Sequence, residues 1–234
     1  MGHIHFMAAD PEAHKKIWME AFGATPVKFG ALEVLKIPGV YLIVGKANNP
    51  LTGGTNGSVV NHIGIAVQDY AAIKGKLAAL HVSMMELTPN QQMFANFPDE
   101  ARIEVFEDKT ISTPIAFHHI HNSVVDQEAA RAWYVKEFGA GAGSRRNSPA
   151  AMIPGGEVDF LKSREAQVAT KGRSLDHIGF EVKDLEATMK KMQADGVTIE
   201  SPLRDMRQQI GLKIAFVIDP WGTRIELTEG LAAK

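Results

Sequence analysis

Four histidines recur at the same place in a repeated motif, and their side chains could bind a metal ion. Each opens a His-Ile dipeptide and is followed seven residues later by an aspartate. The motif reads HIHFMAAD at 3–10, HIGIAVQD at 62–69, HIHNSVVD at 119–126 and HIGFEVKD at 177–184. Imidazole nitrogen is a common ligand of divalent ions such as Zn and Fe. Because a polar residue returns at one position of a repeat, the pattern is more informative than a lone histidine.

Two glutamates stand in a second repeated sequence, Arg-Ile-Glu, near the ends of the second and fourth repeats. They are Glu104 and Glu226. Two neutral imidazoles and one carboxylate suit a divalent ion such as Fe, Ni, Mn, Co or Zn, and three protein ligands leave positions open for substrate and water. Such an ion polarises a carbonyl or hydroxyl oxygen and stabilises the enolate formed when a proton moves. The expected cofactor is therefore a divalent metal ion, held without thiolate ligands because the chain has no cysteine.

Each repeat has the pattern of one strand, one helix and three further strands. In the first repeat HIHFMA alternates as a strand does, and Asp10-Pro11 is a helix N-cap followed by proline at the first helical position. An amphipathic helix then runs to a C-cap at Gly23, and three short strands follow between glycine turns. One helix for every four strands indicates an α+β fold rather than a parallel α/β sheet.

The second half of the chain repeats the first half. The offset is a constant 116 residues between the first and third repeats, as from His3 to His119, and 122 residues between the second and fourth. The segment DKTISTP at 108–114 combines turn-forming residues with a proline and separates the halves. We therefore expect two domains, 1–110 and 114–234, each made of two βαβββ units.

Composition excludes several classes of protein. A formal net charge of −2 at pH 7 provides no excess of Lys and Arg for binding nucleic acid. No apolar run approaches the roughly 18–20 residues of a membrane-spanning helix. The expected partner is a small-molecule substrate, and duplication within one chain favours a monomer over a homodimer. The sequence fixes no compartment: a soluble cytoplasmic protein is the default, and an exported protein is the alternative if a leader precedes the first repeat.

Four βαβββ units that open with His-Ile, two of them ending in Arg-Ile-Glu, resemble the vicinal oxygen chelate superfamily. That superfamily includes glyoxalase I, bleomycin-resistance proteins and extradiol dioxygenases, and the resemblance covers nearly the whole chain. It implies that two units pair, that their strands form an incomplete barrel of mixed sheet, and that a divalent ion lies in the cavity. The implied ligands come from the first strand of each paired unit and from a glutamate on the last strand.

The resemblance implies one set of metal ligands in each half of the chain. In the second barrel, which we expect to be the main site, the set is His119, His177 and Glu226. In the first barrel the set is His3, His62 and Glu104. In glyoxalase I and related lyases a fourth ligand lies on the last strand of the companion unit, and this position falls at Asp159 in the second half and at Tyr41, a poor ligand, in the first.

Alternation along a strand adds neighbours to these ligands, because residues i and i+2 share a face. His121 therefore faces the same cavity as His119 and could act as general acid or base. We assign proton transfer to His121 or to the free carboxylate oxygen of Glu226. Arg224 shares a face with Glu226 and could clamp an anionic substrate group, or it could pair with a nearby carboxylate. Glu181 is another polar residue expected to point inward.

The same alternation applies to the remaining first strands. His5 shares a face with His3, where it could serve in proton transfer or simply pack. Gly64 and Gly179 take the corresponding positions in the second and fourth repeats. A glycine there would leave space for a ligand.

The superfamily supports several reactions on one fold, and the residues favour some of them. Extradiol dioxygenases carry a His and a Tyr ahead of an acidic-Pro-x-Gly turn and the last Glu. This chain keeps DPWG at 219–222 and Glu226, but Phe216 replaces the Tyr, and residues 207–209 (RQQ) stand where the His is expected. Bleomycin-resistance proteins usually lack the His and Glu set that this chain carries twice.

The sequence therefore predicts a metal-dependent enzyme of the glyoxalase kind, a lyase or isomerase acting on a small substrate whose adjacent oxygens chelate the ion. A dioxygenase of the same superfamily that uses Fe(II) is the enzymatic alternative. A non-enzymatic protein that binds a small molecule, as bleomycin-resistance proteins do, is the third interpretation.

Overall fold

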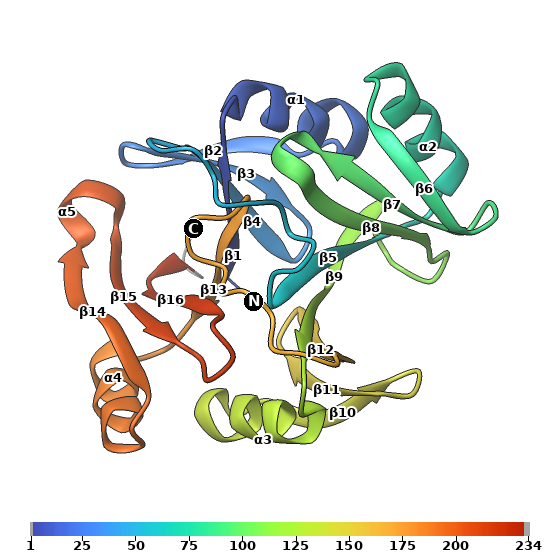
Figure 1. The fold of residues 1–234 in the computed structure, drawn as a ribbon. Helices are drawn as coiled ribbons and strands as arrows, with labels where there is room; N and C mark the ends of the chain where they lie inside the picture. The colour runs from blue at the N-terminus through green and yellow to red at the C-terminus, as the bar shows by residue number, and fades with distance from the viewer. Residues whose placement is uncertain (1, 232–234) are drawn as a thin grey trace.

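The computed structural model describes residues 2–231, and these residues form two mixed eight-stranded sheets with helices packed on their outer faces (Figure 1). The expected α+β class and the four βαβββ units are confirmed. Among residues 2–231 no helix has the length and apolar character needed to cross a membrane.

The four units have the following elements. The first contains β1 (His3–Ala8), α1 (Pro11–Phe22), β2 (Thr25–Phe29), β3 (Leu32–Ile37) and β4 (Val40–Lys46). The second contains β5 (Val60–Val67), α2 (Tyr70–Ala79), β6 (Ser83–Thr88), β7 (Gln92–Phe97), the 3-10 turn η1 (Pro98–Glu100) and β8 (Ala101–Glu107). The third contains β9 (Ile115–Val124), α3 (Gln127–Phe138), β10 (Gly141–Arg145), β11 (Ser148–Ile153) and β12 (Gly156–Lys162). The fourth contains β13 (Leu175–Glu181), α4 (Leu185–Ala194), β14 (Thr198–Met206), α5 (Arg207–Ile210), β15 (Leu212–Ile218) and β16 (Arg224–Glu229).

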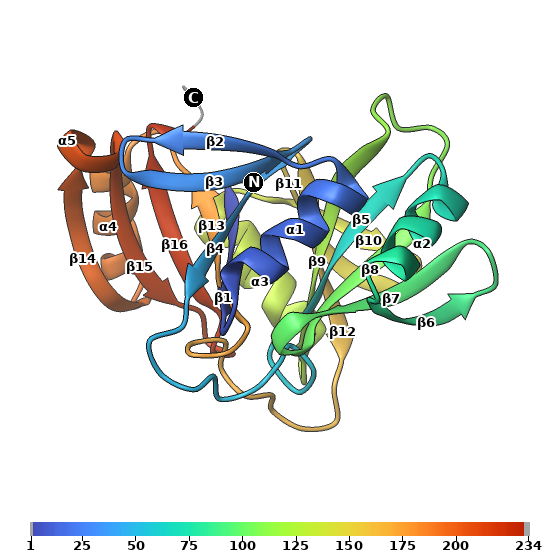
Figure 2. The same ribbon diagram turned by 90° about the horizontal axis from the view of Figure 1, so that it is seen from above.

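The sheets do not follow the expected division into domains 1–110 and 114–234. Sheet 1 has the strand order β14-β15-β16-β13-β1-β4-β3-β2 and so combines the fourth unit with the first. Sheet 2 has the order β10-β11-β12-β9-β5-β8-β7-β6 and combines the third unit with the second. The short link from β8 to β9 brings the third unit beside the second, as consecutive elements usually are. Figures 1 and 2 show β1 and β13, from opposite ends of the chain, side by side.

The aspartate that ends each motif is a helix N-cap, which explains its fixed distance from the histidine. The carboxylates of Asp10, Asp69, Asp126 and Asp184 accept hydrogen bonds from backbone N–H groups in the first turn of α1, α2, α3 and α4. Each such cap stabilises its helix by about 1 kcal/mol.

Apolar side chains lie on both faces of the sheets. A large core, which includes Phe6, Trp18, Tyr70 and Tyr134, packs the helices against the sheets and joins the two halves. A second, smaller cluster is confined to sheet 1, where Phe29 and Val34 of the first unit meet Leu212 and other residues of the fourth. Residues of this smaller cluster line the cavity of the candidate site described below.

Candidate metal centres

The motif histidines meet where the first strands of two units pair antiparallel. In sheet 1, β1 pairs with β13 so that His3 lies opposite Gly179 and His5 opposite His177. In sheet 2, β5 pairs with β9 in the same way, with Gly64 opposite His119 and His62 opposite His121. Each pair therefore joins a His-Ile-His strand to a His-Ile-Gly strand.

The glycines make room for an imidazole of the opposite strand. A Cβ atom on Gly179 would lie 2.2 Å from Cε1 of His3, and one on Gly64 would lie 1.9 Å from Cε1 of His119. Ordinary contacts of a Cβ atom begin near 3.4 Å. The expectation that these glycines leave space for a ligand is therefore wrong, because histidine rings already occupy that space.

The sheet 1 cluster consists of His3, His5, His177 and Glu226, whose donor atoms all lie within 4.8 Å of one another. Nε2 of His3 and Nε2 of His177 each lie 3.0 Å from Oε2 of Glu226. The ring of His5 is 4.4 Å from that of His177, measured between centroids. Nδ1 of His177 lies 2.7 Å from Oδ1 of Asp176, and this contact orients the ring.

The charges of the sheet 1 cluster are set by burial and by the close contacts. Burial opposes ionisation of Glu226, but His3 and His177 outweigh it and hold the pKa of this carboxyl below its usual range. Burial also disfavours the charged form of His177, yet the carboxylates of Asp176 and Glu226 raise its pKa. For His5 burial dominates, and His177 and His3 add to it, so its pKa is lowered and its imidazole is neutral.

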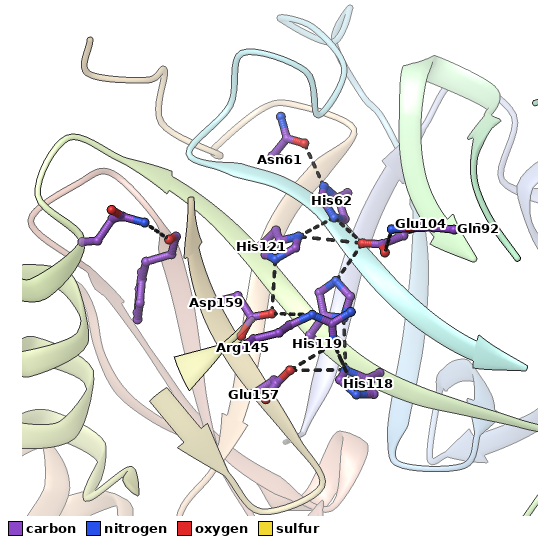
Figure 3. Close-up of polar contacts among 12 residues, drawn as sticks. Asn61, His62, Gln92, Glu104, His118, His119, His121, Arg145, Glu157 and Asp159 are labelled. Carbon is purple, nitrogen blue, oxygen red and sulfur yellow. Dashed lines mark hydrogen bonds and ion pairs between the residues drawn. The ribbon is translucent and has the colours of Figure 1, made fainter. Parts of the chain in front are cut away.

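The sheet 2 cluster consists of His62, Glu104, His119 and His121. Nε2 of His62 is 2.9 Å and Nε2 of His119 is 3.1 Å from Oε2 of Glu104. Nδ1 of His121 lies 2.6 Å from Nε2 of His62. These four side chains point toward one another in Figure 3, where His62 comes from β5, Glu104 from β8, and His119 and His121 from β9.

Every histidine and glutamate that we expected as a ligand lies in one of the two clusters. The clusters, however, combine these residues differently from the two expected sets. His177 and Glu226 lie with His3 rather than with His119. His119 lies with His62 and Glu104. The sets His119, His177, Glu226 and His3, His62, Glu104 are therefore not formed, because the sheets join the first unit to the fourth and the second to the third.

The other expected site residues lie outside the two groups of four. Asp159 is fully buried, and its Oδ2 lies 3.2 Å from Nε2 of His121. Arg224 forms ion pairs with Asp176 and with Glu200. Of the two roles expected for it, pairing with nearby carboxylates is therefore the one observed. Glu181 accepts hydrogen bonds from the Thr228 hydroxyl (2.7 Å) and the Gly230 N–H (2.8 Å), and it borders a surface groove rather than the sheet 1 cluster.

A cavity of about 190 Å³ opens beside the sheet 1 cluster. Its polar floor is formed by His3, His5, His177 and Glu226. Its walls are mostly apolar and come from both units: Phe29, Leu32, Val34, Tyr41, Ile43, Ile210, Leu212, Ile214, Phe216 and Leu231, with Arg204 and Thr228. Sequence reasoning missed these wall residues, although many of them alternate along β3, β4 and β15 as residues on one face do.

Residues 1–227 match the family model described as the Glyoxalase/Bleomycin resistance protein/Dioxygenase superfamily. The chain belongs to this superfamily. Glyoxalase I from Zea mays has a TM-score of 0.74 at 15% identity, covering 97% of this chain and 91% of that chain. A protein from Bacillus subtilis described provisionally as a dioxygenase has a TM-score of 0.68 at 14% identity, covering 97% and 84%. At these identities the likeness shows the fold alone. No curated protein matches the sequence significantly.

The superfamily position of a fourth ligand can be found from strand register. Glu226 pairs with Gly179 across β16 and β13. The same register in the first unit holds Ile43, which pairs with His5. In sheet 1 the positions expected for three ligands therefore hold His3, His177 and Glu226, and the position expected for a fourth holds the apolar Ile43, not Tyr41.

The donor chemistry of both clusters fits a divalent ion. In each, two imidazole nitrogens approach one carboxylate oxygen from different strands, and a third imidazole lies beside them. Buried carboxylates are costly without cationic partners. A divalent ion bound by neutral imidazoles would neutralise this buried charge.

Proposed function

We propose that this chain is a metal-dependent enzyme of the glyoxalase kind whose working site is the sheet 1 cluster. Its substrate is a small molecule that carries two adjacent oxygens. The proposal rests on one observation: His3, His177 and Glu226 line a cavity whose walls are mostly apolar. An ion at these residues would polarise a substrate oxygen and stabilise the negative charge that develops there.

The side chains around the ion position have separable roles. His3, His177 and Glu226 would hold the ion, with Asp176 fixing the ring of His177. His5 lines the same cavity with a neutral imidazole, so it can accept a proton from the carbon beside the substrate oxygen and return it to the neighbouring atom. This proton movement is lyase or isomerase chemistry. The role expected for His121 therefore passes to His5, its counterpart in the first unit.

The size and lining of the cavity support a substrate with a compact apolar body. An apolar cavity of about 150 Å³ is sufficient for benzene. The volume of about 190 Å³ beside the sheet 1 cluster suits one ring or a short branched chain that bears its oxygens at one end. Phe29, Ile43 and Phe216 would contact that body, and removal of its apolar surface from water would drive binding.

A dioxygenase is the second candidate, and the apolar fourth position favours it. Two histidines and one carboxylate with open positions form the ligand set typical of non-haem Fe(II) oxygenases. Ile43 stands where a fourth ligand would be needed to complete a four-residue set. The sequence lacks both the His and the Tyr that extradiol dioxygenases carry before the last Glu, but His5 provides an imidazole in the same cavity.

Metal content and turnover, measured on matched variants, test the proposal. We expect the wild type to bind a divalent ion and to convert either the hemithioacetal of methylglyoxal with a thiol or a catechol in the presence of oxygen. His177→Ala should abolish turnover, whereas His62→Ala, the matched change in the other cluster, should retain most of it. Binding of both probes without turnover, unaffected by a chelator, would instead identify a non-enzymatic binding protein.

A further inference from the structure

The sheet 2 cluster differs from the sheet 1 cluster in what surrounds it, and the duplication allows a comparison position by position. At the 116-residue offset, Arg145 corresponds to Phe29, Glu157 to Tyr41 and Asp159 to Ile43. Strand register agrees: Tyr41 pairs with His3 as Glu157 pairs with His119, and Ile43 pairs with His5 as Asp159 pairs with His121. Three wall residues of the sheet 1 cavity are thus replaced by charged residues in sheet 2.

These charged residues pair with one another. An Nη atom of Arg145 lies 3.1 Å from Oε1 of Glu157, and its Nε lies 3.3 Å from Oδ2 of Asp159. The guanidinium also stacks on Phe106, with its Cζ 5.1 Å from the ring centroid. Figure 3 shows Arg145 lying across the cluster beside His119 and His118. The guanidinium and its partners therefore take the positions whose counterparts line the sheet 1 cavity.

Glu104 is also closed off from the side of the second unit. Gln92 donates a hydrogen bond of 2.5 Å from Nε2 to Oε1 of Glu104. At the 122-residue offset Gln92 corresponds to Ile214, a wall residue of the sheet 1 cavity. One oxygen of Glu104 therefore faces the histidines while the other is held by Gln92.

Each imidazole of the sheet 2 cluster is held by a partner on its other ring nitrogen. Nδ1 of His62 lies 2.8 Å from Oδ1 of Asn61. Nδ1 of His119 lies 3.1 Å from Nδ1 of His118. The third contact joins His121 Nε2 to Asp159. The first two contacts are hydrogen bonds, and the third is a 3.2 Å contact with a carboxylate. Metal-binding histidines typically have such a partner on the ring nitrogen that does not bind the ion, and a carboxylate partner makes the imidazole a stronger ligand.

Asp159 supplies an independent sign that a cation belongs here. It is fully buried, and neither carboxylate oxygen has a hydrogen-bond partner by geometry, so its contacts with Arg145 and His121 are ion pairs only. With Glu104 and Glu157 it makes a buried group of three carboxylates, and the one guanidinium of Arg145 offsets only one of these negative charges. Such a group is costly unless positive charge compensates it.

We propose that the sheet 2 cluster is a closed, structural metal centre that substrate does not reach, with His62, Glu104, His119 and His121 as its four ligands. Arg145, Glu157 and Gln92 take the positions whose counterparts line the sheet 1 cavity, and a metal site without an open position for substrate is typical of a structural centre. The centre joins β5 and β8 of the second unit to β9 of the third, and its ion therefore stabilises the contact between the two halves of the chain. Asp159 is a positioning residue that acts through His121.

Cobalt provides a readout that does not depend on activity. In the His177→Ala variant, which lacks a ligand of the sheet 1 cluster, we expect one Co²⁺ per chain, with an absorption spectrum that acetohydroxamate leaves unchanged. In His62→Ala, whose remaining ion is in sheet 1, acetohydroxamate should shift the spectrum. Loss of all Co²⁺ in His177→Ala, or a spectrum shifted by the probe there, would overturn the proposal. Failure of turnover in sheet 1 would not affect either measurement.

Stability and affinity measurements separate a structural ion from a passive one. Removal of the ion from His177→Ala by a chelator should lower the melting temperature, and adding back Co²⁺ or Zn²⁺ should restore it. Asp159→Asn, which keeps the size of the side chain, should weaken binding of that ion by about 10- to 100-fold. An unchanged melting temperature on removal, or an unchanged affinity in Asp159→Asn, would contradict the assigned roles.

Discussion

Gly179→Ala should disable the sheet 1 cluster by displacing one imidazole. The new Cβ would lie 2.2 Å from His3 Cε1 and also 2.2 Å from its Nδ1, whereas ordinary contact begins near 3.4 Å. The His3 ring must move away by that difference, which breaks its 3.0 Å contact with Glu226. Forcing extra atoms into a packed site typically costs about 1–3 kcal/mol. We expect the free energy of unfolding to fall by that amount, and we expect the variant to lose the sheet 1 ion.

Urea unfolding and metal content per chain measure the two effects of Gly179→Ala. Gly75→Ala is the matched control, because a Cβ on that residue of α2 meets nothing within 4 Å and should stabilise the helix by about 1 kcal/mol. Gly64→Ala should remove the ion of sheet 2 and spare that of sheet 1. If Gly179→Ala kept both its metal and its stability, the antiparallel register that places His3 over Gly179 would be refuted.

Three further changes test other parts of the account. His14 is buried between Phe6 and Phe97 without a hydrogen-bond partner for its ring, and burial lowers its pKa to about 3. The folded state therefore resists protonation of His14, so the free energy of unfolding should fall as the pH drops below 6.5, by about 1.4 kcal/mol per pH unit until the pH nears 3. Urea unfolding of His14→Phe should show a smaller loss of stability between pH 7 and pH 5 than the wild type. An identical loss would contradict this. Asp176→Asn should weaken sheet 1 metal binding by about 10- to 100-fold in a competition with a chelator, since it orients His177, and an unchanged affinity would exclude that role. Ile43→Glu should tighten metal binding in sheet 1 by filling the fourth ligand position, whereas weaker binding would show that this position does not face the ion.

The repeated motif was enough to predict the local structure and the residue types that meet in the two clusters. Its histidine starts a strand and its aspartate caps a helix in all four units, so the spacing of seven residues is fixed by backbone geometry. His3 and His119 occupy equivalent positions, and so do Glu104 and Glu226. Any pairing of units that joins one His-Ile-His strand to one His-Ile-Gly strand gives two His and one Glu.

Sequence alone could not decide which units pair, for the same reason. The expected and observed pairings use the same residue types, and the choice depends on the packing of whole units and on the link between β8 and β9. The role of Gly179 likewise depends on antiparallel register, which places it opposite His3 rather than beside an empty cavity. A difference between the two sites was visible in the sequence, since the 116-residue offset aligns Phe29 with Arg145. Only the structure shows that Phe29 lines a cavity, and so what the change to Arg145 does.

The most direct test of the central claim compares His177→Ala with His119→Ala by metal content per chain and by turnover. The account predicts that the wild type holds two ions, that each variant loses a different one, and that only His177→Ala loses turnover. It also predicts that the double variant loses both ions. If both single changes removed the same ion and abolished turnover, His119 and His177 would share one site, and the pairing of the first unit with the fourth would be contradicted.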